Sequence, residues 1–170
     1  MTILETERLR LRPMNMADAD NLLLIFSDPE AMRYYPSTKD RTETEGWIRW
    51  NVGSYHKHGF GLWIASWKET DEFAGQCGLV RQEVEGSPET EIGYLFLRRF
   101  WRQGLATEAA CACRDYGLTV LGRSRLVSLI NPANTPSRRV AEKVGMTLEK
   151  EIIKWERPTC IYALDAGGAF

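Results

Sequence analysis

The sequence predicts a mixed α+β fold with one central sheet, and two observations carry this prediction. Three strand-like runs separated by short acidic turns lie between residues 61 and 97, a spacing typical of an antiparallel meander. Beyond residue 104, helical patterns alternate with single strands, which favours a mixed sheet covered by helices. Because 170 residues with 44% hydrophobic and 26% charged side chains suit one globular unit, we expect residues 1–170 to form a single domain.

The opening segment predicts a strand followed by a short helix. Leucines alternate with arginines over residues 8–12 and the pattern ends at Pro13, as in a half-buried strand. Asp18 or Asp20 is suited to cap the helix, which should continue to Phe26 and end at Asp28-Pro29.

A second helix and the meander come next. Thr42–Glu45 fits a capping box, in which a threonine oxygen and a glutamate satisfy the free amides of a helix start. Apolar residues at helical spacing then predict a helix that ends near Gly59. The meander strands are expected at residues 61–67, 73–81 and 90–97, with turns at 68–72 and 85–89.

The second half should contain two helices and three strands. A basic segment, Arg98–Gly104, leads into a helix of small residues that continues to Val120. A buried strand at 126–130 and a turn at 131–134 precede a helix at 135–144, which Gly145 ends. The chain should close with strands at 146–155 and 159–164 that turn near Arg157-Pro158.

The charge is balanced overall and unevenly distributed. The formal net charge is −1, which argues against broad affinity for polyanions. Nine lysines and arginines but only three acidic residues lie between Arg98 and Lys143, so this segment carries +6 and the remainder carries −7. The segment from Arg98 to Lys143 is therefore expected to face an anionic ligand. The acidic remainder either suits a cationic partner or serves solubility.

The sequence lacks the usual signatures of several classes of protein. No apolar run follows a basic start, and no stretch approaches the ~18 apolar residues of a membrane span, so we expect a cytoplasmic protein without a membrane partner. Four cysteines form no Cys-x-x-Cys pair and there are only two histidines, so we expect no metal site. The sequence also lacks a phosphate-binding loop of the G-x-x-x-x-G-K type and a complete dinucleotide fingerprint.

The segment around Gly104 has the features of an anion site. A strand that ends at Leu97 is followed by a short loop and a helix that opens at Leu105. The first amides of a helix have no partner within it, and the helix dipole is positive at this end. A glycine lets the backbone approach a phosphate closely. An ordinary helix start with solvated arginines is the alternative.

Three motifs in order resemble a known family. The runs are E-I-G-Y from Glu91, W-R-Q-G-L-A-T-E-A from Trp101, and N-T-P-S-R-R-V-A-E-K-V-G-M from Asn134. They are similar to the GNAT superfamily of N-acetyltransferases, and more narrowly to its RimJ/RimL branch, which acetylates ribosomal-protein N-termini. The start E-R-L-R-L-R-P from Glu7 also fits, so the resemblance covers about residues 4–164.

The resemblance implies a fold and a cofactor site. The fold is a mostly antiparallel twisted sheet of about seven strands with about four helices, whose fourth and fifth strands separate to hold acetyl-CoA. The pyrophosphate should contact the loop residues Arg102, Gln103, Gly104, Leu105, Ala106 and Thr107. The pantetheine arm should pair with Tyr94, Leu95, Phe96 and Leu97 and bond to Asn134, while Arg138 or Arg139 reaches the 3′-phosphate.

The resemblance also implies a reaction, in which acetyl passes directly from the thioester to a primary amine. Glu91 is the candidate base, with a solvated strand-end carboxylate as the alternative, and amides of residues 95–97 would stabilise the developing oxyanion. Many relatives carry a tyrosine acid at the place of Ala141, so Ser137 or a water must protonate the thiolate here. A nucleophilic role for Cys111 or Cys113 is disfavoured.

The acceptor and the assembly stay open. A protein N-terminal α-amine or a small-molecule amine, such as a polyamine or an aminoglycoside, fits the acidic remainder of the chain. A non-catalytic acyl-CoA sensor is the alternative from another class. A nucleic-acid-binding patch is the third interpretation and is disfavoured, because the basic residues surround a loop already suited to pyrophosphate. The protein is expected to be a monomer or a homodimer.

Overall fold

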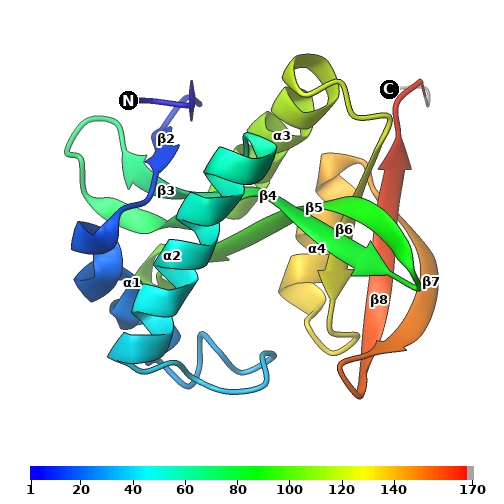
Figure 1. Ribbon diagram of the computed structural model, residues 1–170, viewed down its shortest axis with the longest axis horizontal. Helices are drawn as coiled ribbons and strands as arrows, with labels where there is room; N and C mark the ends of the chain where they lie inside the picture. The colour runs from blue at the N-terminus through cyan, green and yellow to red at the C-terminus, as the bar shows by residue number, and fades with distance from the viewer. Residues whose placement is uncertain (168–170) are drawn as a thin grey trace.

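One eight-stranded sheet organises the protein (Figure 1). The computed structural model describes residues 1–167; residues 168–170 of the expected domain lie outside it. The strands lie in the order β1-β2-β3-β4-β5-β6-β8-β7. Their bounds are β1 Leu4–Glu5, β2 Leu9–Pro13, β3 Leu62–Trp67, β4 Phe73–Val84, β5 Ser87–Phe96, β6 Arg125–Ile130, β7 Thr147–Lys154 and β8 Arg157–Asp165. The short β1, which the sequence pattern did not predict, raises the count above the expected seven.

Four α-helices cover the two faces of this sheet: α1 Ala19–Phe26, α2 Arg41–His58, α3 Leu105–Asp115 and α4 Thr135–Val144. Helices α1 and α2 share a core with β3 and with alternate residues of β4. Helices α3 and α4 share the larger core on the opposite face, where Trp63 and Tyr162 are completely buried. In Figure 1, α2 lies in front of the sheet and α3 behind it.

Within residues 1–167, strands β5 and β6 are the only parallel neighbours, and they separate almost at once. Glu91 and Val127 form their single register pair. Next to that pair, side chains bridge the strands: the Ser128 hydroxyl donates to the Ile92 carbonyl at 2.8 Å. The expected separation of the fourth and fifth predicted strands is therefore present between β5 and β6.

Two hairpin turns differ from the prediction. Strands β4 and β5 continue to a two-residue turn at Glu85-Gly86, where φ is 49° and 80°, instead of ending before a five-residue turn. The last hairpin turns at Trp155-Glu156, with φ of 51° and 61°, and Arg157-Pro158 lie within β8. Pro158 is tolerated there because β6 ends at the level of Cys160, so no neighbour on that side needs a proline N–H.

The helix starts also refine the prediction. Asp40, not Thr42, caps α2: its carboxylate accepts from the Glu43 amide at 2.8 Å, and Glu43 accepts from the Asp40 amide. A 3₁₀ turn, Met16–Asp18, precedes α1, and another, Arg98–Phe100, follows β5. The predicted helix to Val120 is α-helical only to Asp115 and continues as a π-helical segment, Tyr116–Val120. Within residues 1–167, no helix combines the length and apolar character needed to cross a membrane.

Candidate functional site

A cavity of about 490 Å³ lies where β5 and β6 separate. One wall comes from β4 and β5 and the other from β6, the start of α4 and the β7–β8 turn, while the segment between α1 and α2 covers it. Five residues singled out from the sequence line this cavity: Glu91, Tyr94, Leu95, Asn134 and Ser137. The predicted catalytic pair therefore shares one cavity.

Glu91 holds the two strands together at the point of separation. Its Oε2 accepts from the Leu129 amide of β6 at 2.8 Å, and its Oε1 accepts from Gln82 Nε2 at 3.1 Å. Loss of solvent raises the pKa of Glu91 to about 7, against the opposing effects of these two donors and of Lys154. A carboxylate with such a pKa exchanges a proton near neutral pH, as a general base must.

Tyr94 and Asn134 fix the start of α4. The Tyr94 hydroxyl donates to the Ser137 carbonyl at 2.8 Å, and the Asn134 side chain accepts from the Ser137 amide at 3.3 Å. Burial raises the pKa of Tyr94, so its hydroxyl stays protonated and remains a donor. These contacts hold Ser137 at the cavity wall.

Fewer backbone groups of β5 face the gap than the motif implied. The Leu97 amide donates to the Ala74 carbonyl of β4 at 2.9 Å, so it is not available to an oxyanion. Because N–H and C=O directions alternate along a strand, the backbone of Leu95 also faces β4, while Tyr94 and Phe96 face the gap. The Phe96 carbonyl is occupied by the Trp101 indole N–H at 2.9 Å.

The loop before α3 leaves amides uncapped. Gly104 occupies the N-cap with φ of 77°, and no side chain caps this helix, in contrast to Asp40 at α2 and Asn134 at α4. Arg102 also has a positive φ of 64°. The backbone of this loop is thus folded so that the amides of residues 105–107 point outward at the positive end of the helix.

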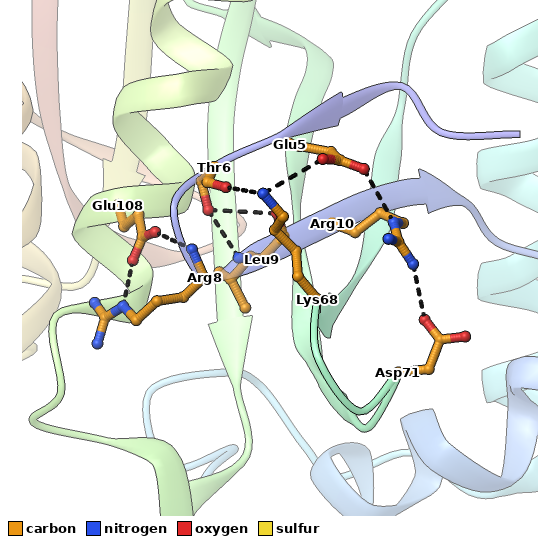
Figure 2. Close-up of polar contacts among 8 residues, drawn as sticks. All are labelled: Glu5, Thr6, Arg8, Leu9, Arg10, Lys68, Asp71 and Glu108. Atoms are coloured by element: carbon orange, nitrogen blue, oxygen red, sulfur yellow. Dashed lines mark hydrogen bonds and ion pairs between the residues drawn. The ribbon is translucent and has the colours of Figure 1, made fainter.

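Arg8 connects this loop to the sheet, as Figure 2 shows. Its Nε and main-chain N–H both bind the Glu108 carboxylate of α3, at 2.7 and 2.8 Å, and its Nη1 donates to the Gln103 carbonyl at 2.9 Å. Neither Arg8 nor Glu108 was among the candidate site residues predicted from the sequence. Both stand inside the quoted motifs, one hundred residues apart, and only the fold shows that they are partners.

Ion pairs involve four of the nine basic residues between Arg98 and Lys143: Arg98, Arg99, Arg114 and Arg125. Arg98 binds Asp28 and Arg99 binds Glu72, at 2.8 and 2.6 Å, instead of facing the loop. Arg138, expected at a phosphate, donates to the Tyr162 hydroxyl and to the Pro132 carbonyl, so two of its three nitrogens hold the fold. The assignment of Arg138 to a phosphate therefore stays a prediction, and these two bonds would orient its guanidinium.

Aromatic side chains form the wall opposite the sheet. Tyr34, Tyr35 and Trp50 line the cavity together with Trp47, whose indole N–H donates to Gln76. Desolvation and the nearby Glu91 charge raise the pKa of Tyr35 to about 12. The tyrosine is therefore a neutral hydrogen-bonding group close to Glu91.

Comparison with known proteins decides the family. A model of the acetyltransferase (GNAT) domain matches residues 8–147. The chain belongs to the GNAT acetyltransferases. It is 46% identical over 162 residues to the uncharacterized protein YkkB of Bacillus subtilis, covering 95% of this chain and 94% of that protein.

Solved structures agree with this GNAT fold. An acetyltransferase from Agrobacterium tumefaciens superposes with a TM-score of 0.85 at 30% identity, covering 96% of this chain and 94% of that one. A RimL ribosomal L7/L12 α-N-protein acetyltransferase in complex with coenzyme A has a TM-score of 0.80, covering 97% and 98%. At 18% identity, this second likeness shows a shared fold.

Other chemistry-bearing side chains of this GNAT acetyltransferase lie away from the cavity. The Cys77 and Cys113 sulfurs are buried and 3.6 Å apart, and their hydrogen bond together with burial raises the pKa of Cys113. His56 and His58 do not line the cavity. Within residues 1–167, no three His, Cys, Asp or Glu side chains are grouped as metal ligands would be.

Proposed function

We propose that this GNAT acetyltransferase transfers acetyl directly from acetyl-CoA to a primary amine. The observation that carries the proposal is the cavity between β5 and β6. It places a half-buried glutamate with a pKa of about 7 on the wall shared with Ser137. Near it, the chain presents an uncapped helix start suited to phosphate. The acceptor is a protein N-terminal α-amine or a small-molecule amine.

The residues present fit coenzyme A. The amides of residues 105–107, with Gly104 providing backbone access, would hold the pyrophosphate. The outward backbone groups of Tyr94 and the Phe96 amide would pair with the pantetheine arm, and Asn134 would bond to it. Arg139 is exposed and lacks an ion-pair partner within residues 1–167, so it stands beside Arg138 as a candidate for the 3′-phosphate.

The chain's own groups account for the proton movements. The thioester would supply the acetyl group. Glu91 would accept the proton that the acceptor ammonium must lose before its nitrogen can attack. The amide of Tyr94 or Phe96 is positioned at the free strand edge to bind negative charge that develops on the carbonyl oxygen. The acceptor nitrogen would lose a second proton as the C–N bond forms. The Ser137 hydroxyl, or a water beside it, would relay this proton to the departing sulfur, because Ala141 offers no hydroxyl.

The test combines turnover with binding. We expect release of free thiol from acetyl-CoA on a panel of N-terminal peptides and small amines. Gly104→Glu should abolish CoA binding, because it places a carboxylate and a strained backbone where phosphate would sit. Gly53→Glu, on an open face of α2, is the matched control and should bind CoA normally.

Two results would contradict the proposal. Unchanged CoA affinity in Gly104→Glu would remove the cofactor site from this loop. Tight CoA binding by the wild-type protein without turnover on any acceptor would instead support the acyl-CoA sensor.

A further inference from the structure

The ionisable side chains that line the cavity are unbalanced in charge. Among the lining residues, all within residues 1–167, three are basic, Lys39, Lys154 and Arg157, and Glu91 carries the only carboxylate. Since the pKa of Glu91 is about 7, its negative charge is only partly present at neutral pH. The cavity therefore carries a positive charge, although the protein has a net charge of −1.

None of the three cations is neutralised by a carboxylate within residues 1–167. Lys39 lies over the rings of Phe26 and Trp47, with its Nζ 6.0 and 5.4 Å from the centroids. The Lys154 Nζ donates to the Glu83 carbonyl, which leaves further donors of this ammonium free. By contrast, other arginines, such as Arg98 and Arg99, are paired with acids.

Two of the cations, Lys154 and Arg157, lie on the same face of the sheet as Glu91, which pairs with Val127. Residues two apart on a strand share a face, so Arg157 lies on the face of Ile161, which packs in a small core with Val127. Lys154 likewise shares the face of Ile152, which packs against the same core. The charge of Lys154 is close enough to Glu91 to lower its pKa.

We infer that the acceptor is an amine that also carries an anionic group. This inference rests on the proposed function and names its substrate class. Glu91 would receive the ammonium, and Arg157 with the lysines would bind the anion, whose arrival neutralises cations that have no acidic partner. A polyamine or an aminoglycoside, with a second positive charge, would instead be repelled. The other carboxylates of the acidic remainder do not change this, because those within residues 1–167 do not line the cavity and some, such as Asp28 and Glu89, bind Arg98 and Arg125.

A carboxylate or a phosphate would satisfy these cations, and matched acceptors separate the two. The pairs are Ala-Asp amide against Ala-Asn amide, alanine against alanine amide, and phosphoethanolamine against ethanolamine, with diaminobutane as the dication. We expect the anionic member of at least one pair to exceed its neutral partner by about tenfold in kcat/KM at low salt. The pair that shows the difference identifies whether the anionic group of the acceptor is a carboxylate or a phosphate.

Variants assign the preference to the cavity. Arg157→Gln and Lys154→Gln should lower the anionic-to-neutral ratio of that pair at least about fivefold. Arg49→Gln, an exposed site of α2 outside the cavity, is the matched control and should keep the wild-type ratio. Midpoints of urea unfolding confirm that the variants are folded.

Three outcomes would overturn the inference: a ratio near one in every pair, a preference for diaminobutane, or a wild-type ratio in the Arg157→Gln Lys154→Gln double variant. If no acceptor is acetylated, the proposed function fails separately. The CoA-bound protein is then titrated with N-acetylalanine and its amide, and equal or absent binding of the two overturns the inference as well.

Discussion

Glu91 combines a structural and a chemical property in one side chain. It satisfies the Leu129 amide, which the separation of β5 and β6 deprives of a backbone partner, and it therefore helps to shape the cavity. The same position removes the carboxylate from solvent and raises its pKa to about 7. The gap between the strands leaves the Leu129 amide without a backbone acceptor, and the Glu91 carboxylate fills that role. Placing a base here therefore requires no additional strained residue.

The pH dependence of turnover tests the chemical part. Because the pKa is raised, Glu91 stays protonated below about pH 7 and becomes a base only above it. We expect kcat/KM to rise with pH through about 7 for the wild-type protein with an acceptor amine of fixed pKa. Glu91→Gln, which can still accept from Leu129, should lower kcat by about 10²- to 10⁴-fold and lose this inflection.

The KM for acetyl-CoA distinguishes this from damage to the cavity. It should stay near the wild-type value in Glu91→Gln. A profile of identical shape in the wild type and the variant would show that Glu91 is not the titrating base.

At the scale of single residues, motifs located the cavity wall but not the hydrogen-bond partners. Glu91, Tyr94 and Asn134 line the cavity as their motifs implied. The motifs did not show that the Leu97 amide bonds to Ala74 or that Arg138 bonds to Tyr162, because these partners are distant in the chain. Whether a donor is free depends on such tertiary contacts, and a linear pattern does not contain them.

The loop before α3 is an element held from outside. Arg102 adopts a positive φ, which costs free energy in a residue other than glycine. Arg8 ties the loop carbonyl of Gln103 and the first turn of α3 to the start of β2. Figure 2 shows Arg10, two residues further along and within β2, bound to Glu5 and Asp71 instead. The two arginines therefore form a natural pair of test and control.

We predict that Arg8→Ala weakens acetyl-CoA use selectively. The KM for acetyl-CoA should rise about tenfold, because a charge-assisted contact to the phosphate loop is lost. The KM for S-acetylpantetheine, which has no pyrophosphate, should change less than about twofold. Arg8→Lys should recover only part of the loss, since lysine lacks the planar fork.

Arg10→Ala controls for the removal of an arginine from β2. Its ion pairs are solvent-exposed, so it should leave both KM values unchanged. Equal increases for both thioesters in Arg8→Ala would indicate general disruption and not loop positioning.

Elements were predictable where local chemistry decides them. Helix α4 matches its predicted bounds, with Asn134 as its cap and Gly145 at a φ of 102°. The hairpin turns were missed because Glu85-Gly86 and Trp155-Glu156 are not the usual Asn-Gly or Asp-Gly pairs. There the register of paired strands, and not the turn residues, determines where the chain reverses.

At the scale of the whole molecule, the uneven charge along the chain becomes pairing in space. The +6 segment and the −7 remainder meet in ion pairs such as Arg125 with Glu89 and Glu149, at 3.1 and 2.7 Å. Such ion pairs occupy part of the basic segment between Arg98 and Lys143 and reduce the charge that it offers to a polymer of phosphates. The uncapped start of α3 offers instead a site for one pyrophosphate.

Thermal unfolding in the presence of different anions tests this view. At one hundred times its Kd, CoA should stabilise the folded protein by about 2.7 kcal/mol, because it binds only the native state. For a domain of this size, that corresponds to a rise in Tm of about 5–11 °C. Duplex DNA at the same phosphate concentration should give no rise, since Arg98, Arg99 and Arg125 are already paired. A DNA-induced rise that declines steeply with salt would restore the nucleic-acid interpretation, because release of counterions from several phosphates produces that dependence.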